Sequence, residues 1–471
     1  MMNIDRKSTL RGLVMALCAV ALAACQSAPE RADEATAESG ASVPAAMLGD
    51  WDGELVAGAQ KLALRLYIAA GGVSLDVPAQ RVAGAKASSV IFADGLLVAE
   101  FDAFRASVEL RAAEGGGLEA IWAQSGARLP LTFARAGDGS AAAVPAAPAV
   151  PARRGESVRF KSGQAGVELA GTLRLPDGKG PFPCLILVSG SGAQDRDEAI
   201  GTIMPFRDIA EGMAARGWAT LRYDDRGVGE SGGTFAGSTS EDFALDAVGA
   251  YRFASADGRI DARRVALAGH SEGGLVIAIA ENLLGGVYGL VSIAGPGVGG
   301  YEILLDQSRD ILAGMGAPAE AIESSQAINR ALYDMILESD EFPLEAVKAE
   351  LSKAGLPPDQ LEAQLPMLRD PWFKAFLRSN PAGYYSKVRS PVLAINGSKD
   401  SQVRAGKNLA AIEAAVKRAG VPVKAVAMDG LNHLFQQANT GMPDEYMGLP
   451  PAFSPEAIAL MADWLDRLGS R

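Results

Sequence analysis

Two serines in this sequence stand in the pattern Gly-X-Ser-X-Gly, which can carry nucleophilic chemistry. In a nucleophile elbow, a strand leads directly into the serine and a helix leads directly out, so the hydroxyl is lifted above a sheet beside a helix N-terminus. Ser271 has a strand-like run before it, residues 264–268, and an apolar helix-like run after it, residues 274–280. Ser231 has neither, so its segment is interpreted as a loop over or beside the site. Ser271 is therefore the predicted nucleophile.

A serine hydroxyl needs a general base at neutral pH, and the chain contains only two histidines. His433 lies in the loop after the last predicted strand, where the base belongs when the order along the chain is serine, acid, histidine. His270 directly precedes the serine and cannot easily turn onto its neighbour's hydroxyl. We predict that His433 is the general base and that His270 packs or makes hydrogen bonds.

The acid that orients the base is expected just after the preceding strand, residues 391–396. Asp400 follows that strand in the segment Asn-Gly-Ser-Lys-Asp. A buried carboxylate there would hold the imidazole tautomer and stabilise the imidazolium that forms during proton transfer. Asp429, which lies shortly before the base, and Glu302 are competing candidates, and Asp400 is preferred.

An acyl-transfer site also needs two backbone N–H groups directed at the developing oxyanion. One is predicted to be the amide of Glu272, the residue after the nucleophile. The other is expected in residues 189–193, Ser-Gly-Ser-Gly-Ala, whose small side chains let a backbone approach the substrate closely. Ser191 is the first choice and Gly192 the second. The charged segment that follows, residues 194–197, either lines the pocket or forms local ion pairs.

Alternating strands and helices from residue 155 onward are expected to position these side chains. Their order specifies an α/β fold, a mostly parallel sheet with helices on both faces. Residues 300–388 interrupt the alternation and are helical in character, so we expect a cap above the carboxyl ends of the strands, where open α/β sheets bind ligands. The predicted strands are 167–175, 182–188, 218–223, 264–268, 289–294, 392–396 and 423–428, and the predicted helices are 204–216, 241–256, 272–284, 404–419 and 455–468.

Residues 45–135 show a different pattern, which predicts a small antiparallel all-β domain. Leucine and isoleucine side chains alternate with other residues over 62–68, which places them on one face of a strand. Asp94-Gly95 separates two short apolar runs, a signal for a two-residue hairpin, and a second hairpin is expected around residues 115–117. The segment contains no histidine or cysteine, so an accessory role is preferred.

The first 24 residues have the features of an export signal: a basic head, then an uncharged stretch, 12–24, too short for the roughly 20 residues that span a membrane. The stretch ends in Leu-Ala-Ala-Cys, which resembles the lipobox of bacterial lipoproteins. The resemblance implies cleavage before Cys25 and lipid attachment to its sulfur, and Gln26 favours the outer membrane, facing the periplasm. An ordinary secretory signal is the alternative. Residues 25–44 would then be a tether, and the Ala/Pro-rich residues 136–154 a linker between the two domains.

The composition excludes several other functions. A net charge of −12 argues against a nucleic-acid partner, because phosphate binding needs a basic surface. Three cysteines and two histidines exclude a disulfide scaffold and a Cys/His-rich metal site, and no metal or organic cofactor is implied. Cys184 lies in an apolar run and is interpreted as a buried hydrophobic residue rather than a nucleophile.

Taken together, the motifs of residues 155–471 resemble those of the α/β-hydrolase superfamily, and in particular the bacterial EstD-type esterases, which overlap in sequence with proline-iminopeptidase-like serine aminopeptidases. The resemblance implies carboxylic-ester hydrolysis with Ser271, Asp400 and His433 as the triad. It departs from many relatives at the oxyanion turn, which has Ser-Gly in place of His-Gly. The motifs are SGSGAQDRDE at 189–198, YDDRGVGES at 223–231, GHSEGG at 269–274, NGSKD at 396–400 and GLNHLFQ at 430–436.

Three functions are weighed on this basis. The preferred one is a lipid-anchored serine esterase that acts on a small-molecule ester through an acyl-enzyme. A serine aminopeptidase on the same triad would need an acidic pocket, for which Glu302 and Asp306 in the cap are candidates. A non-catalytic surface lipoprotein is the third, and the complete triad argues against it. Aromatic residues of the cap would form either an acyl pocket or the cap's own core: Tyr301, Trp372, Phe373, Phe376, Tyr384 and Tyr385.

Overall fold

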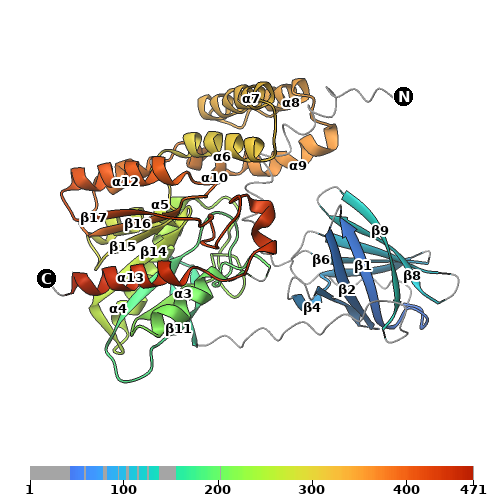
Figure 1. The fold of residues 1–471 in the computed structure, drawn as a ribbon, viewed down its shortest axis with the longest axis horizontal. Coiled ribbons are helices and arrows are strands. Elements are labelled where there is room, and N and C mark those ends of the chain that lie inside the picture. Colours follow the sequence, from blue (N-terminus) through green and yellow to red (C-terminus); the bar gives the residue numbers. More distant parts are fainter. Residues whose placement is uncertain are drawn as a thin grey trace. The chain divides into compact units, whose positions relative to one another are not determined.

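The structure is a computed structural model that describes residues 43–136 and 155–469, apart from short internal gaps. These residues form two compact units, one all-β and one α/β (Figure 1). The predicted signal peptide, Cys25, almost all of the tether and all but the first residue of the linker lie outside the described residues. Within the described residues, no helix combines the length and the hydropathy needed to cross a membrane. The gaps are 58–59, 70, 78–81, 94, 102–105, 114–115, 125–126 and 202.

The all-β unit is a nine-stranded antiparallel sheet in the order β4-β3-β2-β1-β9-β8-β7-β6-β5. Leu64, Leu66 and Ile68 point into its core, as their alternation predicts. The two predicted hairpins are present, because β5 pairs with β6 across residues 94–95 and β7 pairs with β8. The strands are β1 Gly49–Ala57, β2 Gln60–Ala69, β3 Gly72–Val77, β4 Val82–Lys86, β5 Ser89–Ala93, β6 Leu96–Phe101, β7 Ala106–Ala112, β8 Leu118–Gln124 and β9 Ala127–Arg135.

The α/β unit is built on an eight-stranded sheet in the order β10-β11-β13-β12-β14-β15-β16-β17. From β13 to β17 neighbouring strands are parallel, whereas β11 is antiparallel to both β10 and β13. The strands are β10 Glu156–Lys161, β11 Glu168–Arg174, β12 Phe182–Val188, β13 Ala219–Tyr223, β14 Ile260–His270, β15 Leu290–Ile293, β16 Val392–Gly397 and β17 Val423–Met428.

Helices cover both faces of this sheet and form two separate apolar cores. Residues of α4, α5 and α12 pack in one core, and residues of α3 and α13 pack in the other. Ser454 caps α13 by accepting a hydrogen bond from the amide of Ala457. The helices are α3 Pro205–Ala214, α4 Ser240–Ala256, α5 Gly273–Leu284, α12 Ala405–Ala419 and α13 Pro455–Leu468, and a 3₁₀ helix, η3, spans Pro443–Gly448.

A helical cap follows β15, at the position predicted for it, and has a core of its own. The chain returns from the cap to β16 through a buried anchor: a carboxylate oxygen of Glu281, near the end of α5, accepts hydrogen bonds from the amides of Arg389 and Ser390 and from the Ser390 hydroxyl. The α/β-hydrolase fold with a helical cap and a preceding antiparallel all-β domain is therefore confirmed. The cap helices are α6 Gly300–Gly314, α7 Ala319–Glu338, α8 Leu344–Lys353, α9 Pro358–Arg369, α10 Pro371–Leu377 and α11 Pro381–Tyr385.

Candidate active site

Ser271 occupies a sharp turn between β14 and α5. Its backbone φ is +50°, a left-handed conformation that is strained for a residue with a side chain. The flanking glycines make the turn possible, because a Cβ at Gly269 would lie 2.0 Å from the carbonyl oxygen of Gly273, and one at Gly273 would lie 2.4 Å from that of Val188. The surrounding backbone therefore fixes the Ser271 hydroxyl at the carboxyl end of a central strand.

Ser231, the other serine in the same pattern, has a structural role. Its hydroxyl donates a hydrogen bond to the carbonyl oxygen of Asp224 at 2.7 Å and accepts one from the amide of Ala170 at 2.9 Å. The side chain is buried, so it ties the loop after β13 to β11.

His433 and Asp400 meet in the loops after β17 and β16. The imidazole Nδ1 donates to Oδ2 of Asp400 at 2.8 Å, and both side chains are almost fully buried. Oδ1 of the same carboxylate accepts the amides of Gln402 and Val403, each at 2.8 Å, which fixes its orientation. Nε2 of His433 is buried and has no hydrogen-bond partner in the described part of the chain. One ring nitrogen is thus held by a carboxylate, and the other is left as a proton acceptor.

The loop that carries His433 lies against the serine turn. The rings of His270 and His433 are 4.7 Å apart between centroids, and Nε2 of His270 lies 3.0 Å from the carbonyl oxygen of His433. Because His270 is the residue before Ser271, these contacts place the loop of the predicted base beside the residue that precedes the predicted nucleophile, although the two lie 162 positions apart along the chain.

The competing acids have other partners. Asp429 accepts a hydrogen bond from the Ser398 hydroxyl at 3.2 Å in an exposed setting, and Glu302 forms an ion pair with Lys407 on the cap side. Of the three acids considered, Asp400 is the one whose carboxylate contacts His433.

The turn after β12 lies beside the nucleophile. A Cβ at Gly190 would be 3.0 Å from the Cβ of Ser271, so the backbone passes very close to the serine. The Gly190 amide is already used, because it donates to Oε1 of Glu198 at 2.7 Å. Ser191 and Glu272, the two predicted oxyanion residues, both line the pocket that contains Ser271. Glu272 also sits at the N-terminal end of α5, where backbone N–H groups favour negative charge.

The side chain of Glu272 has a second role that the sequence analysis did not include. It is buried and accepts hydrogen bonds from the Ser240 hydroxyl at 2.5 Å and from Nε1 of Trp372 at 2.9 and 3.0 Å. Burial raises the pKa of this carboxyl to about 7, although the two hydrogen bonds act in the opposite direction. Because Trp372 belongs to α10, the residue after the nucleophile is fastened directly to the cap.

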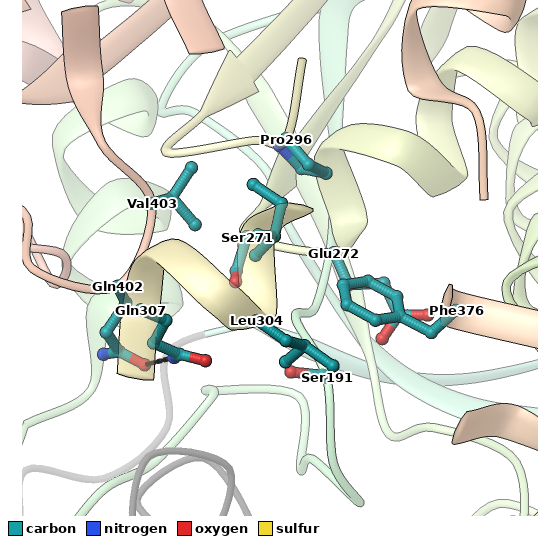
Figure 2. A pocket seen from close by; sticks show the side chains of 10 residues that line it. Ser191, Ser271, Glu272, Pro296, Leu304, Gln307, Phe376, Gln402 and Val403 are labelled. Carbon is teal, nitrogen blue, oxygen red and sulfur yellow. Dashed lines mark hydrogen bonds between the residues drawn. The ribbon is translucent and has the colours of Figure 1, made fainter. Parts of the chain in front are cut away.

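A small pocket with a cavity volume of about 30 Å³, partly open to solvent, has Ser271 in its wall. Figure 2 shows Gln307 and Gln402 on one side of Ser271 and Phe376 on the other. The two glutamines are hydrogen-bonded to each other at 3.2 Å. The lining is otherwise mainly apolar, and it comprises Ser191, Ser271, Glu272, Pro296, Ile303, Leu304, Gln307, Phe376, Gln402 and Val403.

Phe376 is the one cap aromatic from the predicted set that lines this pocket. Trp372 stacks on it at a centroid distance of 5.1 Å. Phe373 belongs to the cap core, and the buried Tyr385 donates its hydroxyl proton to the carbonyl of Gly274 at 2.6 Å. Tyr301 has an exposed partner on the cap. Phe376 thus lines the pocket and Phe373 lies in the cap core, whereas Tyr385 belongs to the core that α4, α5 and α12 form against the sheet.

Residues 194–197, the charged segment after the predicted oxyanion turn (residues 189–193), contain two arginine or aspartate side chains in ion pairs. Arg196 pairs with Asp224, and Asp197 pairs with Arg222 at 2.7 Å; all four side chains are buried. Glu198, the residue after them, was missed by the sequence analysis as an individual residue. It accepts hydrogen bonds from the oxyanion turn and from His270, and its backbone φ of +51° is again left-handed.

Cys184 is completely buried on β12, and burial raises the pKa of its thiol to about 12, which keeps it protonated and unreactive at neutral pH. Among the described residues, no three histidine, cysteine, aspartate or glutamate side chains are grouped so that they could hold a metal ion.

Known proteins resemble parts of this chain. Residues 165–434 match the sequence pattern of a family described as X-Pro dipeptidyl-peptidase (S15 family). Esterase EstD of Thermotoga maritima is 29% identical over 281 residues, which cover 59% of this chain and 61% of that protein. The chain thus matches less than two thirds of that relative's length.

Solved structures give a similar picture at lower identity. The DcsB complex with its substrate analogue is 20% identical, covers 67% of this chain and 100% of its own, and has a TM-score of 0.43. Proline iminopeptidase of Mycobacterium smegmatis is 17% identical, covers 66% of this chain and 98% of its own, and has a TM-score of 0.42. Est1E of Butyrivibrio proteoclasticus with bound ferulic acid is 14% identical, covers 67% of this chain and 100% of its own, and has a TM-score of 0.40.

Proposed function

The chain belongs to the X-Pro dipeptidyl-peptidase (S15) family, and on that premise we propose that it is a serine hydrolase that cleaves carboxylic esters through an acyl-enzyme. The observation that carries the proposal is the buried pair of His433 and Asp400, joined at 2.8 Å, with the second ring nitrogen unpaired and the histidine packed against the residue that precedes Ser271. The strained conformation of Ser271 and its place in a pocket wall support the same reading.

In the proposed reaction, the Ser271 oxygen attacks the ester carbonyl while Nε2 of His433 takes its proton. Asp400 holds the imidazole through Nδ1 and stabilises the imidazolium. The amides of Glu272 and Ser191 stabilise the oxyanion of the tetrahedral intermediate. Collapse of the intermediate releases the alcohol, which takes the proton from His433, and leaves an acyl group on Ser271. Water, deprotonated by His433, then releases the acid and restores the serine.

The charges around the pocket support an ester substrate with a neutral acyl group over a substrate with a free amino group. An amino group would need an unoccupied carboxylate. Glu272, the acidic side chain among the described lining residues, already accepts hydrogen bonds from Ser240 and Trp372. Glu302 and Asp306, the cap candidates for an amino-group site, form ion pairs with Lys407, and Asp306 also pairs with Arg404.

A serine aminopeptidase on the same residues is the second candidate, and the family match favours it. Comparing kcat/KM for a p-nitrophenyl ester of a short acyl chain with kcat/KM for proline and X-Pro naphthylamides separates the two. The ester proposal expects the ester to be preferred. A preference for a naphthylamide would assign the chain to the peptidases. The third candidate, a non-catalytic binding protein, would hydrolyse neither substrate.

The proposed nucleophile is tested with Ser271→Ala. Removing a triad member costs on the order of 10⁴-fold or more in kcat, so ester hydrolysis and labelling by a fluorophosphonate probe should both disappear. Ser231→Ala is the matched control, since it alters the other serine in the same sequence pattern and should keep the label. Unchanged hydrolysis by Ser271→Ala, or a label on Ser231, would reject the assignment.

We also propose that the protein is exported and anchored by a lipid on Cys25, in the outer membrane and facing the periplasm. The support is the Leu-Ala-Ala-Cys sequence at the end of the apolar stretch and the Gln that follows it. Two or more acyl chains would make such an anchor stable.

A further inference from the structure

His270, the histidine without a role in the proposed reaction, is held between two acceptors. Its Nε2 lies 3.0 Å from the carbonyl oxygen of His433, and its Nδ1 lies 2.9 Å from Oε1 of Glu198. A carbonyl oxygen can only accept a hydrogen bond, so Nε2 must carry a proton. The protonation of Nδ1 then depends on the state of Glu198.

The surroundings of Glu198 indicate an ionised carboxylate. Its Oε1 accepts the Gly190 amide at 2.7 Å in addition to the ring of His270, while Oε2 is buried and has no partner in the described residues that a carboxylic proton could reach. In a neutral His270 one ring nitrogen has no proton, and its lone pair would face the lone pair of either Glu198 Oε1 or the His433 carbonyl oxygen. Such a contact is repulsive, so the geometry favours a ring that carries both protons. Burial lowers the pKa of His270, but the Glu198 carboxylate and the hydrogen bond to His433 raise it more, and the net direction is upward.

The pair touches both halves of the catalytic apparatus. Glu198 holds the amide of Gly190 in the oxyanion turn, and His270 holds the backbone of His433, the proposed base. A buried ion pair is weak as a source of stability, because the desolvation of both charges offsets their attraction. Its geometric effect is larger, since misplacing a reacting group by about 1 Å can cost on the order of 10²-fold in rate.

We propose that Glu198 and His270 form a second histidine–carboxylate pair that positions the oxyanion turn and the backbone of His433 for the reaction. Both are positioning residues, which act through their neighbours and not on the reacting atoms. This inference rests on the proposed function, because it assigns a role in that same site.

The substitution Glu198→Gln separates charge from hydrogen bonding. The amide oxygen of glutamine can still accept from Gly190 and from Nδ1 of His270. Without the negative charge, His270 becomes neutral, and a ring that keeps its proton on Nδ1 presents a bare Nε2 to the carbonyl of His433. The support on the base would be lost, while the support on the oxyanion turn would remain.

The protonation state of His270 is measured directly in the wild-type protein by ¹⁵N NMR. Because the chain has two histidines, selective ¹⁵N-histidine labelling gives two ring spin systems, and a His270→Gln sample identifies which belongs to His270. We expect both ring nitrogens of His270 to carry protons at pH 7 in the wild type, and one to lose its proton in Glu198→Gln. A His270 ring that is neutral in the wild type at pH 7 would overturn the proposal. This result does not depend on which substrate the protein hydrolyses.

The kinetic consequence is measured beside a matched control. We expect Glu198→Gln to lower kcat for the ester by about 10- to 100-fold with little change in KM, since positioning affects the reaction more than binding. Asp246→Asn is the control: it also turns a buried carboxylate into an amide, in the ion pair that Asp246 of α4 forms with Arg226. An equal loss of kcat in the two variants, or full activity in Glu198→Gln, would reject the positioning role. If the wild-type protein hydrolyses no ester, the proposed function fails, and the spectra still decide the state of His270.

Discussion

The two oxygens of Asp400 have different tasks, and this makes the residue a sensitive test of the triad. Oδ2 holds His433, and Oδ1 holds two backbone amides. In Asp400→Asn, the side-chain oxygen must stay on the amides of Gln402 and Val403 to hold the loop, so the NH₂ group faces Nδ1 of His433. An NH₂ group donates a hydrogen bond, so Nδ1 loses its proton, the proton moves to Nε2, and the base has the wrong tautomer. We expect kcat to fall by on the order of 10⁴-fold with KM nearly unchanged. Asp429→Asn should keep full activity, and the reverse pattern would make Asp429 the acid.

Glu272 gives a prediction on stability against pH. Its pKa is raised from 4.5 to about 7 in the folded protein, so between these values the folded state binds the proton more tightly than the unfolded state. Its contribution is therefore complete below about pH 4.5 and is lost as the pH rises towards 7. In Glu272→Gln this loss is absent, so the free energy of unfolding of the variant relative to the wild type should rise with pH, by at most about 1.4 kcal/mol per pH unit. Urea unfolding at pH 5, 6, 7 and 8 measures it; parallel curves would contradict the predicted pKa.

The sequence predicted the residues whose roles follow from type, spacing and order. Ser271, His433 and Asp400 each follow a strand, so their approximate place at one edge of the sheet could be inferred. Glu198 and the side chain of Glu272 could not be assigned in the same way, because their partners come from distant segments: Trp372 is 100 residues from Glu272, and His270 is 72 from Glu198. Nothing in a linear pattern specifies such contacts.

At the scale of elements, the bond between Trp372 and Glu272 joins α10 of the cap to the start of α5. Trp372→Phe removes the N–H donor but retains an aromatic ring to stack on Phe376. We expect a loss of about 1–3 kcal/mol in the free energy of unfolding and a higher KM for the ester, since Phe376 lines the pocket. Thermal unfolding and steady-state kinetics measure both. Tyr301→Phe, which removes an exposed cap hydrogen bond to Asp334, should change neither; equal effects in the two variants would show that the contact with Glu272 is not special.

The elements themselves were predictable where burial leaves a strong pattern. The apolar run 182–188, predicted as a strand, is β12, and the predicted helix 455–468 matches α13. β10 was missed, because most of its residues are at least partly exposed and it has no apolar run. β14 begins at Ile260, four residues before the predicted start, where charged residues occupy its first half. Pairing with a neighbouring strand, and not the local sequence, makes these segments extended.

For the whole molecule, the proposed lipid attachment at Cys25 predicts where the protein is found. Cys25→Ala should abolish incorporation of labelled palmitate and move the protein out of the membrane fraction. Cys18→Ala, within the same apolar stretch, should leave both unchanged. Palmitate incorporation and membrane fractionation of cells that express each variant are the measurements. Retention of the lipid in Cys25→Ala would contradict attachment at Cys25, and a wild-type protein that incorporates no palmitate would favour the ordinary secretory signal.

The strand topology of the α/β unit could be predicted from the sequence more completely than that of the all-β unit. Hairpin signals and alternation indicated an antiparallel sheet for residues 45–135, but the number and order of its nine strands depend on long-range pairing, such as that between β1 and β9. In the α/β unit, the alternation of strands and helices restricts the connections much more strongly. The cap was recognised because it breaks that alternation.

Helix α5 is fastened to the cap near both of its ends, by Glu272 at the first turn and Glu281 at the last. The inserted segment leaves the sheet after β15 and returns before β16, and it is attached to this helix at two points. The first attachment is the indole N–H of Trp372, and the second is the pair of backbone amides of Arg389 and Ser390. Helices α7–α9 precede both attachment points along the chain and contribute none of the described residues that line the pocket. Chimaeras that exchange residues within α7–α9 while retaining Trp372, Arg389 and Ser390 should therefore keep both attachments and the serine turn intact.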